Sequence, residues 1–159
     1  MKKGTKTIVY DRDLGLEAYY FEGIAQPFPN HFHEHYVIGL MEGDTRTLSC
    51  RNREYTIDKG CILLFNPGDN HACVQSETVT PDTCPQSRDT TTDAYICGES
   101  AWDGFLYYRG LNISRETMLD LAEEITGKRM LPGFSENVIR DSEAACCLHP
   151  LHKMISPFS

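Results

Sequence analysis

The middle of the chain is a series of short apolar segments separated by turn residues. HYVIGLM, YTI and CILLF are rich in β-branched and aromatic residues, and EGD, DKG and NPGDN stand between or after them. Short strands with Gly, Pro and Asn at the turns are typical of a β-sandwich or a small barrel. The sequence therefore predicts a mainly β body from Gln26 to about Gln75.

The second half of the chain changes character. Residues 76–100 are polar and rich in threonine, and they predict a long surface loop that precedes a further strand in GFLYYRGLNI. Ser114 is then expected to cap a helix that Gly127 ends. Asp141 is expected to cap a second helix, which contains Pro150. The order is thus a β body followed by two helices.

Composition limits the possible functions. A chain of 159 residues is the size of one domain. Its net charge of −8 and the lack of a Lys/Arg stripe predict that this chain alone binds DNA poorly. It has no apolar run near the roughly 20 residues that span a bilayer and no apolar stretch of a secretory signal at its start. We therefore expect a cytoplasmic protein without a membrane partner.

Three histidines alternate in NHFHEHYVIGL. His31, His33 and His35 would project from one face of a continuous strand, because successive side chains in a strand point to opposite faces. The other face carries apolar residues that include Tyr36 and Leu40. A strand that is apolar on both faces is buried on both, so a helix or a second subunit is expected to cover its outer surface.

A fourth histidine, His71, follows the tight turn at Pro67 and Gly68. If the two strands lie across a small barrel, His71 faces His31 and His33. Converging neutral imidazoles are ligands for a divalent transition metal such as zinc, nickel or iron, and His35 would extend this site. The alternative is that the histidines are polar lining of a pocket and form hydrogen bonds to a ligand.

The histidine segment and GCILLFNPGDNH together resemble the paired motifs of the cupin superfamily. With REYTIDKG, LNI, EITG, LPGF, VIRD and LHPLH in this order, the chain resembles more closely the N-terminal effector-binding and dimerisation domain of AraC-family transcription regulators. The resemblance implies a cupin jelly-roll barrel in residues 1–113. It also implies that residues 114–159 form a helical region for homodimerisation that leads into a DNA-binding half.

The same resemblance implies a function and a set of contacts. A small polar effector would bind in the barrel, and DNA would be bound only through a C-terminal half that is absent from this chain. The expected effector-binding residues are His31, His33, His35, His71, Arg46 and Tyr107. For two of these an alternative remains, since Arg46 could be a solvated charge at a sheet edge and Tyr107 a core aromatic.

One departure from the cupin pattern separates two functions. The glutamate ligand of the first cupin motif is missing, and Val37 and Ile38 stand at its expected place. This loss favours a sensor over an enzyme. The alternative function is a small cupin metalloenzyme of the dioxygenase or isomerase type, with a histidine-bound metal that has open coordination positions.

Overall fold

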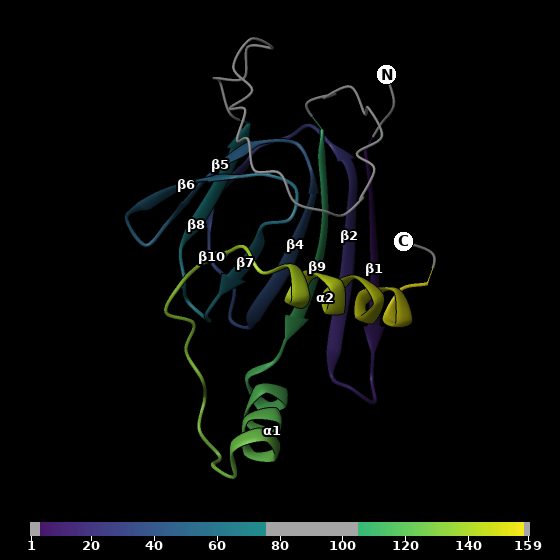
Figure 1. The fold of residues 1–159 in the computed structure, drawn as a ribbon, viewed down its shortest axis with the longest axis vertical. Coiled ribbons are helices and arrows are strands. Elements are labelled where there is room, and N and C mark those ends of the chain that lie inside the picture. Colours follow the sequence, from purple (N-terminus) through teal and green to yellow (C-terminus); the bar gives the residue numbers. More distant parts are fainter. Residues whose placement is uncertain (1–3, 76–104, 158–159) are drawn as a thin grey trace, which may run out of the picture.

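A computed structural model describes residues 4–75 and 105–157, which form two antiparallel β-sheets and two helices (Figure 1). The larger sheet has the order β1 (Thr5–Asp11), β2 (Leu16–Ile24), β9 (Leu106–Ile113), β4 (Tyr36–Gly43), β7 (Ile62–Phe65) and β10 (Val138–Ile139). The smaller sheet has the order β3 (Phe28–His31), β8 (His71–Gln75), β5 (Arg46–Cys50) and β6 (Arg53–Ile57). The predicted fold class, a mainly β cupin barrel followed by two C-terminal helices, is confirmed. The predicted loop at residues 76–100 lies outside the described residues.

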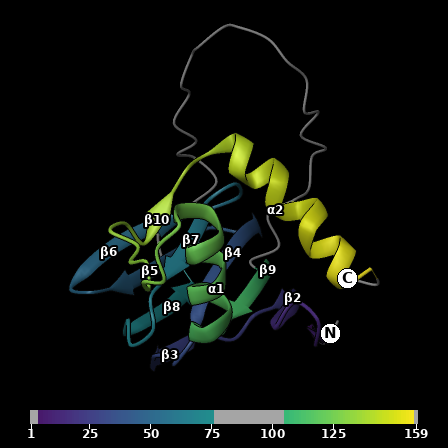
Figure 2. The same ribbon diagram turned by 90° about the horizontal axis from the view of Figure 1, so that it is seen from below.

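The larger sheet is apolar on both faces. Successive side chains of its central strands point alternately into the hydrophobic core between the sheets and into a second core on the outer face. Val37 and Met41 of β4 point into the interior between the sheets. Tyr36 and Ile38 point outward and pack with Leu148 of α2 (Ser142–Ile155). This helix lies across the outer face of the sheet, over β4, β9 and β1 (Figures 1 and 2). A helix thus covers the outer face of β4, the apolar part of the segment for which a helix or a second subunit was expected.

Both helices begin at the residues that the sequence indicates. The side chain of Ser114 accepts a hydrogen bond from the backbone N–H of Thr117, at 3.1 Å, and starts α1 (Arg115–Thr126). Gly127 ends α1 in the left-handed conformation, with φ of 73°. The side chain of Asp141 accepts from the N–H of Ala144 and starts α2. No helix in the part of the chain that is described is both long and apolar enough to cross a bilayer.

The structure corrects two expectations about the strands. The three alternating histidines do not share one strand, because β3 ends at His31 and β4 begins only at Tyr36. His71 does not face His31 from across the barrel. The two residues are direct partners in neighbouring antiparallel strands of the same sheet. In addition, β1 and β2 precede the segment from which a β body was predicted.

Candidate functional site

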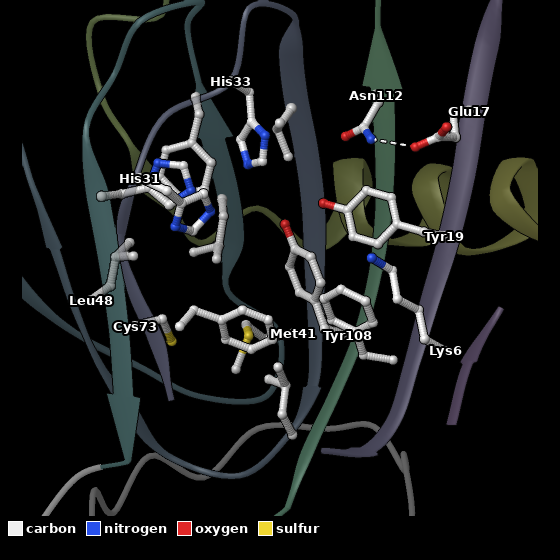
Figure 3. Close-up of a pocket in the computed structure, with 17 residues that line it drawn as sticks. Lys6, Glu17, Tyr19, His31, His33, Met41, Leu48, Cys73, Tyr108 and Asn112 are labelled. Atoms are coloured by element: carbon white, nitrogen blue, oxygen red, sulfur yellow. Dashed lines mark hydrogen bonds between the residues drawn. The ribbon is translucent and has the colours of Figure 1, made fainter. Parts of the chain in front are cut away.

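A cavity of about 220 Å³ lies between the two sheets (Figure 3). Pockets for drug-sized ligands usually measure about 300–1,000 Å³, so this cavity suits a smaller molecule. Most of its wall is apolar and comes from both sheets; these residues include Phe21, Phe28, Val37, Met41, Leu48, Leu63, Phe65 and Leu106. The polar groups are few and fall into three sets: the histidines, two tyrosines, and the residues Lys6, Glu17 and Asn112.

The first polar cluster consists of three histidines. His31 at the end of β3, His33 in the following connection and His71 at the start of β8 each offer one nitrogen, and these nitrogens lie within 4.8 Å of one another. The ring centroids of His31 and His71 are 4.3 Å apart, as expected for directly paired residues. His71 also stacks on Phe65, with 3.9 Å between centroids, which fixes the plane of its ring.

Backbone carbonyls set the orientation of two of these rings. Nδ1 of His31 lies 2.7 Å from the carbonyl oxygen of Pro29, and Nδ1 of His71 lies 2.9 Å from that of Asp69. In a neutral imidazole, an Nδ1–H that donates to a carbonyl leaves Nε2 as the nitrogen with a free lone pair. A metal-binding histidine is usually held in this way. The cluster therefore presents acceptor nitrogens to the cavity.

Two histidines of the cluster, His33 and His71, resist protonation. Burial, and then the neighbouring imidazoles of His71, His35 and His31, lower the pKa of His33 to about 4. Burial also lowers the pKa of His71, although its hydrogen bond to Asp69 acts in the opposite direction. His33 and His71 are therefore neutral near pH 7 and do not offer a positive charge to a carboxylate.

Two tyrosines form the second polar cluster, on the larger sheet. Tyr19 and Tyr108 are hydrogen-bonded to each other, and their hydroxyls point toward the histidine side of the cavity (Figure 3). Burial raises the pKa of both phenols, so both remain protonated. Glycines make room for the rings: a Cβ atom at Gly39 would overlap Tyr108, and one at Gly110 would overlap Tyr19.

The remaining polar residues of the wall are the pair Glu17 and Asn112 and, separately, Lys6. Nδ2 of Asn112 donates to the Glu17 carboxylate at 2.7 Å, while its buried Oδ1 has no hydrogen-bond partner among the described residues. Nζ of Lys6 lies 5.1 Å from the centroid of the Phe21 ring. Lys6 and Glu17 carry opposite charges, and His33 and His71, whose pKa values are lowered, add none.

Three of the residues expected to bind an effector lie elsewhere. Arg46 does not line the cavity and is fully buried, so the alternative of a solvated edge charge is also wrong. Its guanidinium donates to the carbonyl oxygens of Ile24 and Gln26, at 2.8 and 3.2 Å. Tyr107 packs beside Gly43, on the opposite face of β9 from the cavity residue Tyr108. The ring of His35 lies 5.0 Å from that of His33 but does not line the cavity.

Several residues of the site were not predicted. Tyr19, Glu17 and Lys6 belong to β1 and β2, whose strand pattern was not recognised. Their only signal is the alternation of polar and apolar residues in TKTIVYD and LEAYYFEGI. Asp69 was also missed, although it stands in the NPGDNH motif, two residues before His71. A turn aspartate has so many local roles that its position alone did not indicate one.

Comparison with known proteins places this site in a family. The family model described as "AraC-like ligand binding domain" matches residues 13–157, which include every described strand except β1, both helices and the whole cavity wall except Lys6. This chain belongs to the AraC-like ligand-binding domain family. The resemblance seen in the sequence is confirmed. Membership places the chain among ligand-binding domains and not among the cupin enzymes that were the alternative.

One curated relative matches nearly the whole chain. The uncharacterized HTH-type transcriptional regulator YbfI of Bacillus subtilis (strain 168) is 38% identical over 156 residues, which are 98% of this chain and 48% of that protein. The chain thus spans about half the length of the relative that it matches.

Solved structures with a similar fold have little sequence identity. A cupin superfamily protein from Desulfitobacterium hafniense is 5% identical, with a TM-score of 0.46 over 71% of this chain and 79% of that one. KdgF from Halomonas sp. is 14% identical, with a TM-score of 0.46 over 73% of this chain and 85% of that one. These likenesses concern the fold alone.

Proposed function

We propose that this chain is the ligand-sensing domain of a transcription regulator and that a small polar molecule binds in its histidine-lined cavity. Membership of the AraC-like ligand-binding family supports the class of function. The observation that carries the proposal is the convergence of His31, His33 and His71 on the cavity, opposite the paired hydroxyls of Tyr19 and Tyr108. These groups form polar contacts in an otherwise apolar wall, as is usual for a small-molecule site.

The geometry also supports a metal ion as part of the site. His31, His33 and His71 would hold it, since neutral imidazole nitrogens suit zinc, nickel and iron and the three rings present their nitrogens close together. The carbonyls of Pro29 and Asp69 already orient two of these rings from behind. A metal with three protein ligands offers a Lewis-acidic position to an oxygen or nitrogen atom of the effector.

The charge of the cavity favours an effector with little net charge. His33 and His71 stay neutral at pH 7, and Lys6 and Glu17 offset each other. Without a metal, the histidine nitrogens accept hydrogen bonds, so the effector would donate N–H or O–H groups to them. The apolar floor around Phe21, Phe28 and Leu106 would receive its carbon skeleton.

We further propose that the full-length protein is a homodimer and that effector binding changes how attached DNA-binding halves contact their sites. The B. subtilis relative, whose name describes an HTH-type regulator and whose length is about twice that of the match, supports a second half. Binding can alter this output only if the effector prefers one arrangement of the domain. Sedimentation equilibrium with and without effector measures the association step.

The site is tested by measuring zinc binding in two matched variants. Isothermal titration calorimetry with Zn²⁺ should give one ion per wild-type chain. His33→Ala should abolish this binding, because it removes one of three ligands. His35→Ala removes an imidazole of the same segment that lies outside the cavity and should leave stoichiometry and affinity unchanged.

The result of the zinc titration tests the metal proposal separately from the sensing proposal. If the wild type does not bind Zn²⁺, Ni²⁺ or Fe²⁺, the metal proposal is wrong. The sensing proposal is then tested by screening uncharged and zwitterionic metabolites for thermal stabilisation. A hit that stabilises wild type but not Tyr108→Phe would support binding in the cavity.

A further inference from the structure

The turn formed by residues 66–70, between β7 and β8, holds two of the three histidines in place. The N–H of Gly68 donates to the carbonyl oxygen of His33 at 2.8 Å. The carbonyl oxygen of Asp69 accepts from Nδ1 of His71 at 2.9 Å. A shift of this turn therefore moves the backbone of His33 and the carbonyl that orients the ring of His71, whereas the carbonyl of Pro29 orients the ring of His31.

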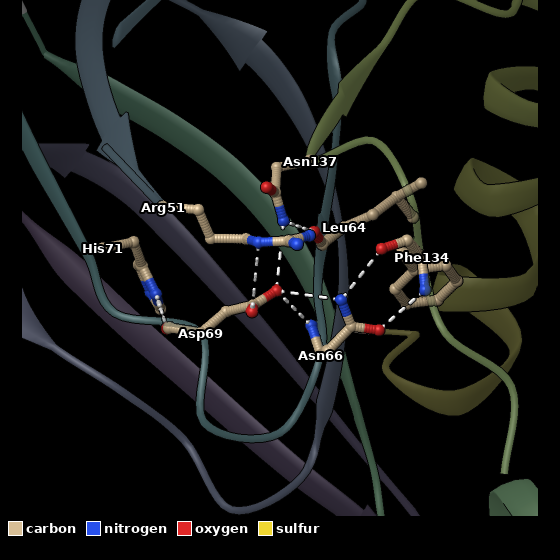
Figure 4. Close-up of polar contacts among 7 residues, drawn as sticks. All are labelled: Arg51, Leu64, Asn66, Asp69, His71, Phe134 and Asn137. Atoms are coloured by element: carbon tan, nitrogen blue, oxygen red, sulfur yellow. Dashed lines mark hydrogen bonds and ion pairs between the residues drawn. The ribbon is translucent and has the colours of Figure 1, made fainter. Parts of the chain in front are cut away.

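The side chain of Asp69 determines the shape of this turn. Its Oδ2 atom accepts hydrogen bonds from the backbone N–H and the Nδ2 of Asn66, at 2.9 and 3.0 Å (Figure 4). The same oxygen accepts from Nδ2 of Asn137 at 3.1 Å. Asn137 lies 68 residues further along the chain. Asp69 thus joins the histidine turn to a distant segment.

That distant segment, residues 134–137, leads directly into β10 and then α2. Asn66 forms two hydrogen bonds with the backbone of Phe134, at 2.7 and 3.0 Å. Asn137 is 2% exposed and forms two hydrogen bonds with the backbone of Leu64 in β7. Its Nδ2 donates to the Leu64 carbonyl, and its backbone carbonyl accepts from the Leu64 N–H. The segment is therefore bound to the turn by several partly buried hydrogen bonds, which leave few alternative arrangements.

We propose that Asp69 and Asn137 form the link through which occupation of the histidine site is transmitted to the segment that starts α2. A ligand on His33 and His71 stabilises one position of the turn, and this position is the one that Asn66, Asp69 and Asn137 hold together. Coupling of this kind is reciprocal, so loosening residues 134–137 must also weaken binding at the histidines. The proposal rests on the proposed function only for what occupies the site.

The test uses Zn²⁺ as the probe and compares two neighbouring substitutions. Asn137→Ala removes the donor to Asp69, and Glu136→Gln changes an exposed side chain whose nearest charged partner is Arg53 at 4.0 Å. In the wild type, Zn²⁺ should slow hydrogen–deuterium exchange in peptides that cover residues 134–141. Asn137→Ala should weaken Zn²⁺ binding about tenfold and remove this protection, whereas Glu136→Gln should leave both as in wild type. If Asn137→Ala does not fold, Asn137→Ser replaces it, since serine keeps a donor at a shorter reach.

A second readout does not depend on metal binding. In metal-free protein, Asn137→Ala should shift the imidazole ¹⁵N resonances of His71, because the turn that accepts its Nδ1–H is released. A wild type that fails to bind Zn²⁺ would contradict the metal proposal, but this shift would still support the link. Unchanged His71 resonances in Asn137→Ala, or Zn²⁺ binding as tight as in wild type, would overturn it.

Discussion

Nε2 of His152 on α2 lies 2.8 Å from the carbonyl oxygen of Tyr19, whose phenol ring lines the cavity. The imidazole is 2% exposed and its other nitrogen, Nδ1, lies 3.5 Å from the guanidinium of Arg109. The neutral ring therefore donates through Nε2 and accepts through Nδ1. Through this contact, α2 binds the outer side of the strand whose inner side carries a cavity tyrosine.

His152 predicts a dependence of stability on pH. Burial, and then Arg109 and His149, lower the pKa of this imidazole from 6.5, although its bond to the Tyr19 carbonyl and the nearby Glu42 act in the opposite direction. Below about pH 6.5 the unfolded chain binds a proton that the folded protein excludes, so the free energy of unfolding falls as the pH falls. His152→Gln keeps a donor for Tyr19 but does not titrate. Urea unfolding between about pH 7.5 and 5.5 should show a shallower decline for this variant than for the wild type; identical slopes would contradict the prediction.

Substitution of Arg46 should lower stability without changing the cavity site. Arg46→Met leaves the carbonyls of Ile24 and Gln26 without their donors and Asp44 without the guanidinium 3.7 Å away. Removing one partner of such a buried group should lower the free energy of unfolding by about 3 kcal/mol, measured by urea denaturation. Zn²⁺ affinity of the folded variant should equal that of the wild type. A selective loss of affinity would instead restore the effector-binding role first expected of Arg46.

Substitution of Gly39 should change the shape of the cavity. A methyl group in Gly39→Ala would overlap the ring of Tyr108, which must then move into the cavity. Overpacking of this kind should cost about 1–3 kcal/mol and should abolish stabilisation by any cavity ligand. Gly133→Ala is the control, since its nearest neighbouring atom would be 4.0 Å from the new methyl group. Equal melting temperatures for the two variants would contradict this account.

Two ion pairs of similar length should differ in how much they stabilise the fold, because their burial differs. Nε of Arg109 lies 2.6 Å from the Glu42 carboxylate and its side chain is 7% exposed, so Glu42→Gln should cost about 2 kcal/mol. Arg129 and Asp120 form an equally short pair on the surface, at 2.5 Å. Asp120→Asn should cost clearly less than Glu42→Gln, because solvent screens an exposed pair. Thermal unfolding of both variants compares the two environments directly, and a larger loss for Asp120→Asn would contradict the prediction.

Local patterns predicted the helices well. Ser114, Gly127 and Asp141 act through bonds to residues within four positions, so their roles could be inferred from sequence alone. The turn at Pro67 and Gly68 was likewise recognised, because a glycine with φ of 87° is required there whatever the surroundings.

Sequence patterns were enough to predict that a β body precedes two helices and that His31, His33 and His71 come close together. The folded sheets were needed to show that His35 and Arg46 lie outside the cavity, that Tyr19 lines it and that Asp69 orients His71. This difference follows from the range of the interactions. Caps and turns are satisfied within a few residues, whereas the role of a polar side chain depends on partners from strands that only the folded sheets bring together.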